Sequence, residues 1–167
     1  MAIFQCHNTA LAEWHSLIHE AELRAECLVD EALESYLVYL LMRFSKNSDL
    51  VHSILALDFL NSLDLIGRQK HLKLQELGDK CLLLAGLFPE RAIRKQVSAR
   101  YFINMGQLAF DNLYQNELHT LHPNLVYRDL TAQFAHLVQI LKATRNQVEI
   151  QQELFLIDQS HFGKNLH

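Results

Sequence analysis

Glycine and proline are scarce in this sequence, which has 167 residues but only five glycines and two prolines. None of them precedes Gly67, so no helix breaker interrupts the N-terminal part of the chain. Half of the residues are hydrophobic, which excludes disordered, collagen-like and low-complexity classes. No stretch alternates hydrophobic and polar residues for long enough to predict a strand. The sequence therefore predicts an all-α fold, with about six to eight helices around a buried central helix in one domain, residues 1–167.

Catalytic motifs are absent as well. The five glycines are isolated from one another, so the chain lacks a glycine-rich phosphate loop. It also lacks the Gly-x-Ser-x-Gly nucleophile elbow, the His-Glu-x-x-His zinc motif and the Glu-x-x-His pairs of di-iron bundles. We therefore predict no catalytic residue and no cofactor, and we lean against an enzyme.

Disulfide and membrane signals are weak. Three cysteines, an odd number without a disulfide-dense layout, favour a reducing cytoplasm, and the N-terminus lacks the pattern of a signal peptide. The candidate span, residues 50–66, is interrupted by Asp58 and Asp64 and is shorter than the ~20 apolar residues that cross a bilayer. These features predict a cytoplasmic protein without a membrane helix.

Hydrophobic residues at three- and four-residue spacing predict the helices. The first begins at Asn8 or Thr9, and the others cover 30–44, 49–66, 69–85, 89–95, 98–115, 126–141 and 147–157. Segment 49–66 is hydrophobic on nearly every side, which is typical of a central helix. Gly67 and Gly86 are expected to end helices, Ser98 to cap one, and residues 158–167 to form a frayed tail. On the helix at 69–85, the lysines, Lys80 among them, are expected to face solvent.

Two glycines lie inside predicted helices. Gly78 and Gly106 each cost about 1 kcal/mol relative to alanine at such positions, so a packing or functional reason should offset them. A close crossing of helices 69–85 and 98–115 explains both, and Ala109 would extend the surface of small residues.

The charge is segregated along the chain. The formal net charge is −4, which excludes a globally basic nucleic-acid binder, but residues 67–100 alone carry +5 and residues 1–66 carry −7. The basic part includes a compact run near a predicted helix start: Arg91, Arg94, Lys95 and Arg100. This run is either a solvated face or a surface for an anion or an acidic protein.

Asp79 follows Gly78 within an apolar stretch and allows two interpretations. It is either solvated beside Lys80, or partly buried and paired with an arginine such as Arg91, Arg94 or Arg100. In the second case, a ligand pocket would be lined by Asp79, Glu90, Arg91 and Tyr101.

Ten histidines raise the question of a metal site. His15 and His19 lie one helical turn apart, with Glu22 on the same side, and this spacing suits a transition metal at a helix surface. The alternative is an exposed polar face, because the sequence identifies no further ligand from another helix.

Three segments together resemble an uncharacterised family of small helical bacterial proteins, over roughly residues 28–140. The segments are Tyr36-Leu37-Val38-x-Leu40-Leu41, Gly78-Asp79-x-x-Leu82-Leu83-Leu84-x-Gly86-Leu87-Phe88-Pro89-Glu90 and Tyr101-Phe102-x-x-Met105-Gly106-x-x-Ala109-Phe110. The resemblance implies a helical fold and a bacterial cytosolic setting, and it implies no activity.

These observations favour a non-enzymatic interaction or regulatory protein that binds another protein and self-associates. The alternatives are a ligand sensor or enzyme with the pocket described above, and a metal-binding bundle. We expect neither a membrane nor a nucleic acid as partner.

The basic run generates a test by charge reversal. Changing both Arg91 and Arg94 to Glu should abolish capture of a partner, because an acidic face would then be repelled. The melting temperature should stay nearly unchanged, because surface charges alter stability by about 0.5 kcal/mol at most. Capture by a folded double variant would contradict a working basic surface.

Overall fold

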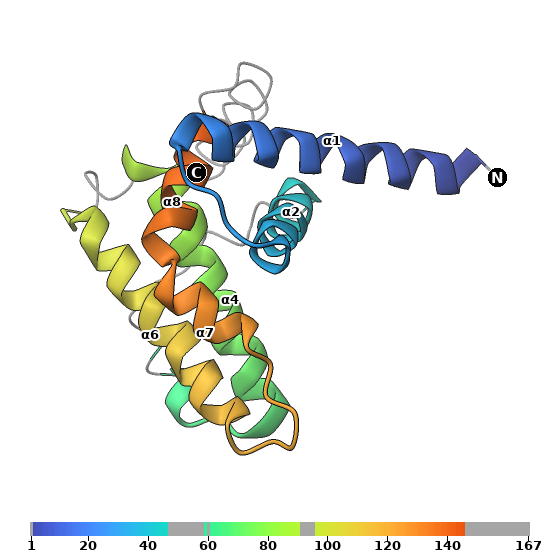
Figure 1. Cartoon of the computed structure of the whole chain (residues 1–167). Coiled ribbons are helices and arrows are strands. Elements are labelled where there is room, and N and C mark those ends of the chain that lie inside the picture. The colour runs from blue at the N-terminus through green and yellow to red at the C-terminus, as the bar shows by residue number, and fades with distance from the viewer. Residues whose placement is uncertain (1, 47–58, 60, 91–95, 146–167) are drawn as a thin grey trace, which may run out of the picture.

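The computed structural model describes residues 2–46, 59, 61–90 and 96–145, and of residues 2–9 it describes the backbone only. The described residues contain no strand, and six helices have their full bounds within them, which confirms the all-α fold (Figure 1). These helices are α1 (Ala2–Ala25), α2 (Glu31–Lys46), α4 (Gly67–Leu87), α6 (Ala99–Glu117), α7 (Val126–Ala132) and α8 (Phe134–Arg145). Predicted segment 147–157 and tail 158–167 lie outside the described residues.

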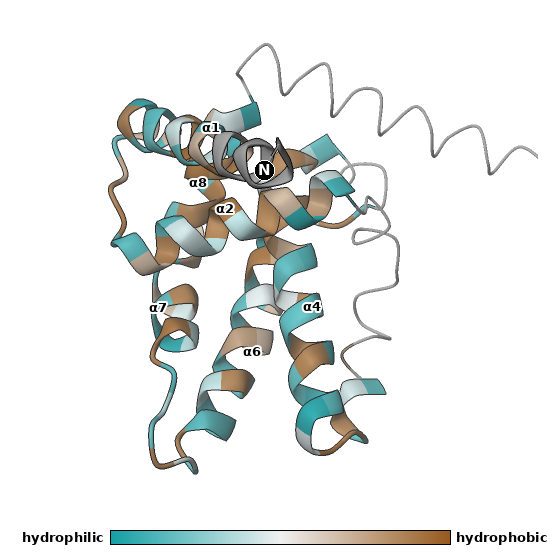
Figure 2. Cartoon of the chain, turned by 90° about the vertical axis from the view of Figure 1, so that its right-hand side faces the viewer, coloured by the Kyte–Doolittle hydropathy of each residue, from teal (hydrophilic) through white to brown (hydrophobic). Residues whose placement is uncertain are grey.

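Helix α4 is the most buried of these helices. Every residue from Leu77 to Leu87 is buried, and α4 packs along both α6 and α8. The sequence assigned the central position to 49–66, of which 49–58 and 60 lie outside the described residues. Hydrophobic and hydrophilic residues interleave along α4 and α6 (Figure 2), and within α4 even the polar residues Asp79 and Lys80 are buried.

Two expectations about α4 are wrong. Gly86 does not end the helix, which continues to Leu87. A Cβ on Gly86 would collide with the Cβ of Leu141 in α8, so glycine allows the two helices to pack closely there. Lys80, expected to face solvent, is 3% exposed, and its Nζ lies 3.8 Å from Glu76 Oε1.

Glycines also permit the contacts around α6. A Cβ on Gly78 would lie within 3 Å of the Phe110 ring, and a Cβ on Gly106 would lie 2.8 Å from Cys81 Cβ and closer still to the Phe134 ring. Ala109 is fully buried on the same helix. The small residues thus lie where α4, α6 and α8 meet, and aromatic rings fill the space that larger residues would need.

The C-terminal helical segment is divided. Ser98 caps α6 as expected, since its Oγ accepts from Tyr101 N at 3.3 Å. The predicted helix 126–141 is instead two helices, α7 and α8, which separate at Gln133. Gln107 of α6 donates its side-chain amide to Thr131 O at 3.2 Å, and a side chain that engages a helical carbonyl is a recognised cause of a kink.

The N-terminal helices lie across one end of the bundle. Helix α1 packs on α2 and α8, and its N-terminal part extends beyond the other helices (Figure 1). It starts at Ala2, so the expected start at Asn8 or Thr9 is wrong. Asp30 Oδ1 accepts from Leu33 N at 2.9 Å and caps the start of α2.

The packing around Gly106 gives a stability prediction. We expect Gly106→Leu to destabilise the protein by about 1–3 kcal/mol or more, because the new side chain would collide with Phe134 and Cys81. Urea denaturation measures the change. Asn104→Leu is the matched control, since Asn104 is exposed on the same helix and should tolerate leucine. Equal stability of the two variants would contradict the tight contact.

Candidate functional site

Three acidic or basic side chains are buried among the described residues, Glu22, Asp79 and Lys80, and Asp79 of α4 is 2% exposed. Its Oδ1 accepts from Tyr36 Oη at 2.6 Å, and its Oδ2 accepts from Arg43 Nη2 at 2.9 Å. Both partners lie on α2, where seven residues place them two turns apart on one face. Each carboxylate oxygen therefore has its own donor. We call Asp79, Tyr36 and Arg43 the Asp79 cluster.

Burial dominates the electrostatics of the Asp79 cluster. It raises the pKa of Asp79 to about 6, although the Arg43 charge and the Tyr36 hydroxyl act in the opposite direction. Desolvation and the nearby Asp79 carboxylate raise the pKa of Tyr36 well above its ordinary value, so the phenol remains a donor. Desolvation and the Asp79 carboxylate also raise the pKa of Tyr127, to about 12.

The arginine that pairs with Asp79 differs from the expected ones. The sequence suggested Arg91, Arg94 or Arg100, but Arg43 takes this position, and Arg100 is exposed. Arg43 is 36 residues away from Asp79 along the chain, so local spacing gave no signal for the pair. The available clue was that Tyr36 and Arg43 share one face of a predicted helix.

The other residues of the expected pocket have separate partners in the described structure. Glu90 Oε2 accepts from Arg145 Nη1 at 2.9 Å. Tyr101 is half-buried and packs edge-on against Phe102, with ring centroids 5.7 Å apart. Arg91, Arg94 and Lys95 lie outside the described residues. Within the described ranges, no hydrogen bond or ion pair joins Asp79, Glu90 and Tyr101 into one site.

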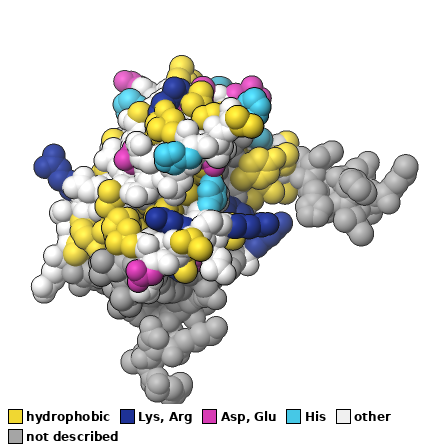
Figure 3. All heavy atoms as spheres, turned by 90° about the horizontal axis from the view of Figure 1, so that it is seen from below, with side chains coloured by type: hydrophobic (Ala, Val, Ile, Leu, Met, Phe, Trp, Pro, Cys, Tyr) yellow, Lys and Arg dark blue, Asp and Glu magenta, His cyan; other side chains and the backbone are white. Residues whose placement is uncertain are grey.

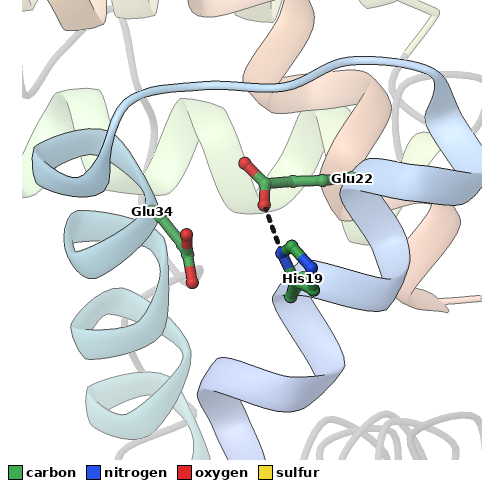
Figure 4. Close-up of side chains that lie close together, drawn as sticks. All are labelled: His19, Glu22 and Glu34. Atoms are coloured by element: carbon green, nitrogen blue, oxygen red, sulfur yellow. Dashed lines mark ion pairs between the residues drawn. The ribbon is translucent and has the colours of Figure 1, made fainter.

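A second polar cluster lies between α1 and α2. His19, Glu22 and Glu34 each offer one ligand atom, and the three atoms lie within 4.8 Å of one another (Figure 4). His15 Nδ1 lies 3.3 Å from Glu34 Oε1. The sequence had grouped His15, His19 and Glu22, and α2 adds Glu34 to that group. We call these four residues the α1–α2 cluster.

One end of the bundle exposes large hydrophobic side chains. His71 connects the elements there: its Nε2 lies 3.0 Å from Tyr127 Oη and its Nδ1 lies 3.9 Å from Glu117 Oε1. The start of α4, the end of α6 and the start of α7 therefore meet (Figure 1). The exposed residues near this meeting point, here called the apolar end, are Leu63, Ile66, Leu72, Leu118, Leu121 and Leu125.

Viewed from this end, hydrophobic side chains lie among Lys, Arg, His and some Asp and Glu side chains (Figure 3). Helix α4 begins here without an acidic residue in its first turn, and Arg68 and Lys70 lie within its first four residues. Within the first turn of α4, the positive end of the helix dipole therefore adds to two basic side chains. The apolar end is hydrophobic and carries basic side chains at the start of α4, with Asp64 and Glu117 as acidic neighbours.

Fold and sites together define an all-helical bundle with a buried carboxylate, Asp79, held by two donors from α2. A scan against family models and searches of curated proteins and of solved structures found no match to the chain. The resemblance to an uncharacterised bacterial family therefore stays a prediction. Among the described helices, none combines the length and the apolar character needed to cross a membrane.

The Asp79 cluster gives a pH prediction for Asp79→Asn. In the unfolded chain Asp79 loses its proton near pH 4, whereas in the folded protein its pKa is about 6. Between these pH values the unfolded state releases the proton more readily, so folding becomes less favourable as the pH rises. The stability advantage of the wild type over the variant should fall by an amount on the order of 3 kcal/mol between pH 4 and 7.

Urea denaturation of both proteins at several pH values measures this difference. Tyr36→Phe provides a companion test, because removal of the donor should extend the fall to higher pH. An advantage of the wild type that instead grows with pH would show that Arg43 and Tyr36 outweigh desolvation.

Proposed function

We propose that the protein is a non-enzymatic interaction module that binds a partner protein through its apolar end. The observation that carries the proposal is the gathering of six exposed leucine and isoleucine side chains from two separate segments, 63–72 and 118–125. Contiguous exposed hydrophobic surface on a soluble domain commonly marks a contact with another protein. Ile66 is 85% exposed and Leu121 is 95% exposed, so both would gain from burial against a partner.

The charge of this end suggests the chemistry of the partner. Arg68 and Lys70 at the start of α4, together with the positive end of its dipole, give the apolar end groups that attract anions. A complementary surface would be hydrophobic with acidic residues at its edge. A second copy of the chain is one such partner, because residues 1–66 carry a net −7.

The Asp79 cluster supports an interaction role over a catalytic one. Both carboxylate oxygens accept hydrogen bonds from α2, which leaves the group engaged in joining helices. Glu90 is likewise paired, with Arg145. A general acid or base must reach the substrate group with which it exchanges a proton. Asp79 and Glu90 instead accept hydrogen bonds from side chains of the protein itself. The proposal keeps the bacterial cytosolic setting that the cysteine content and the family resemblance favour.

The double variant Ile66→Asp with Leu121→Asp tests the proposed surface. We expect binding of the partner, or self-association, to weaken at least tenfold, because each aspartate would bury a charge in the contact. Quantitative affinity capture measures the first and sedimentation velocity the second. Melting curves should stay close to those of the wild type, since both positions are exposed.

Leu28→Asp is the matched control. Leu28 is 71% exposed in the connection between α1 and α2, away from the apolar end. It should leave association unchanged. The proposed surface would be contradicted if Leu28→Asp lost association or if the double variant kept it. The basic run at 91–100 would then be the next surface to test.

A further inference from the structure

We propose that the α1–α2 cluster binds one divalent transition-metal ion, with Zn²⁺ as the preferred ion. His19, Glu22 and Glu34 would supply the ligand atoms, and His15 would position Glu34. The site is separate from the apolar end, so it does not depend on the proposed function.

The geometry brings the three ligand atoms to one point. His19 Nδ1 lies 3.5 Å from Glu22 Oε2, and α2 directs Glu34 toward the same space (Figure 4). Two ligands at about 2.1 Å from a tetrahedral ion are separated by roughly 3.4 Å, which is close to the observed His19–Glu22 distance. The largest separation in the group is bounded by 4.8 Å, and the exposed His19 side chain can rotate to shorten it.

Glu22 is the residue that most needs a cation. It is 2% exposed, and its Oε1 accepts from the backbone N–H of Val29 at 3.1 Å. In the described structure, the closest positively ionisable group to its Oε2 is the imidazole of His19 at 3.5 Å, beyond ordinary hydrogen-bond distance. A buried carboxylate oxygen directed at an imidazole and at a second carboxylate is costly without positive charge. A metal ion would supply that charge.

The surroundings favour a cation in the same way. Residues 10–34 contain seven acidic side chains and one basic side chain, Arg24, whose Nη2 is paired with Glu20 at 3.7 Å. The summed field of these charges raises the local concentration of cations. His15 Nδ1, at 3.3 Å from Glu34 Oε1, would hold that carboxylate in orientation, as second-sphere partners commonly do for metal ligands.

The donor set selects the class of ion. Imidazole nitrogen with carboxylate oxygens suits Zn²⁺ and neighbouring transition ions, whereas Mg²⁺ and Ca²⁺ prefer oxygen ligands alone. Because the ligands come from two helices, a bound ion would join α1 to α2 and stabilise the folded state.

The experiment is a titration of the metal-free full chain with Zn²⁺, followed by calorimetry and native mass spectrometry. We expect one tightly bound Zn²⁺ per chain, a rise in melting temperature, and no displacement by excess Mg²⁺. His19→Ala and Glu34→Gln should each weaken binding at least tenfold, and circular dichroism should show that both variants remain folded.

The control must address the other histidines. His119 and His122 are exposed in the connection between α6 and α7, and the double change of both to Ala should keep the stoichiometric Zn²⁺ site. The proposal is overturned if the wild type binds no stoichiometric Zn²⁺. It is also overturned if folded His19→Ala and Glu34→Gln retain wild-type affinity, or if the His119/His122 double variant loses the site.

Discussion

The burial of the Asp79 carboxylate is the constraint around which the described helices are arranged. A carboxylate in an apolar interior is costly unless donors satisfy it, and the donors come from α2, far away in sequence. Helix α2 therefore has to lie where Tyr36 and Arg43 reach α4. Arg43 remains half-exposed, so its own charge keeps contact with water while it pairs with the buried group.

Gly78, next to Asp79, belongs to the same arrangement. Its missing Cβ leaves room for the ring of Phe110, and Phe110 packs edge-on against Tyr36 with ring centroids 6.1 Å apart. Tyr36 then directs its hydroxyl to Asp79. The two adjacent residues thus have linked roles, since the glycine admits the ring that supports the tyrosine and the aspartate accepts from that tyrosine. This linkage accounts for a glycine inside a helix despite its cost of about 1 kcal/mol.

Sequence periodicity predicted most of the helices, because the spacing of buried residues is a local property. It failed where a distant side chain decides the outcome. The division at Gln133 depends on Gln107 from α6, and the continuation through Gly86 depends on packing against Leu141. The candidate sites show the same limit: one turn of α1 places His15 and His19 together, whereas Glu34 and Arg43 join their clusters only through the packing of α2.

Helix α2 contributes to both polar clusters, and this couples them. Glu34 faces α1, whereas Tyr36, two residues later, faces α4. The two contacts therefore hold the same turn of α2 in position. A shift of α2 large enough to separate Glu34 from the α1–α2 cluster would also withdraw Tyr36 from Asp79 and leave a buried carboxylate short of a donor. Because the cost of that loss is high, the interior cluster holds the α1–α2 cluster in register even without a cation. Preorganised ligands lose little entropy on binding, so this coupling favours the metal site.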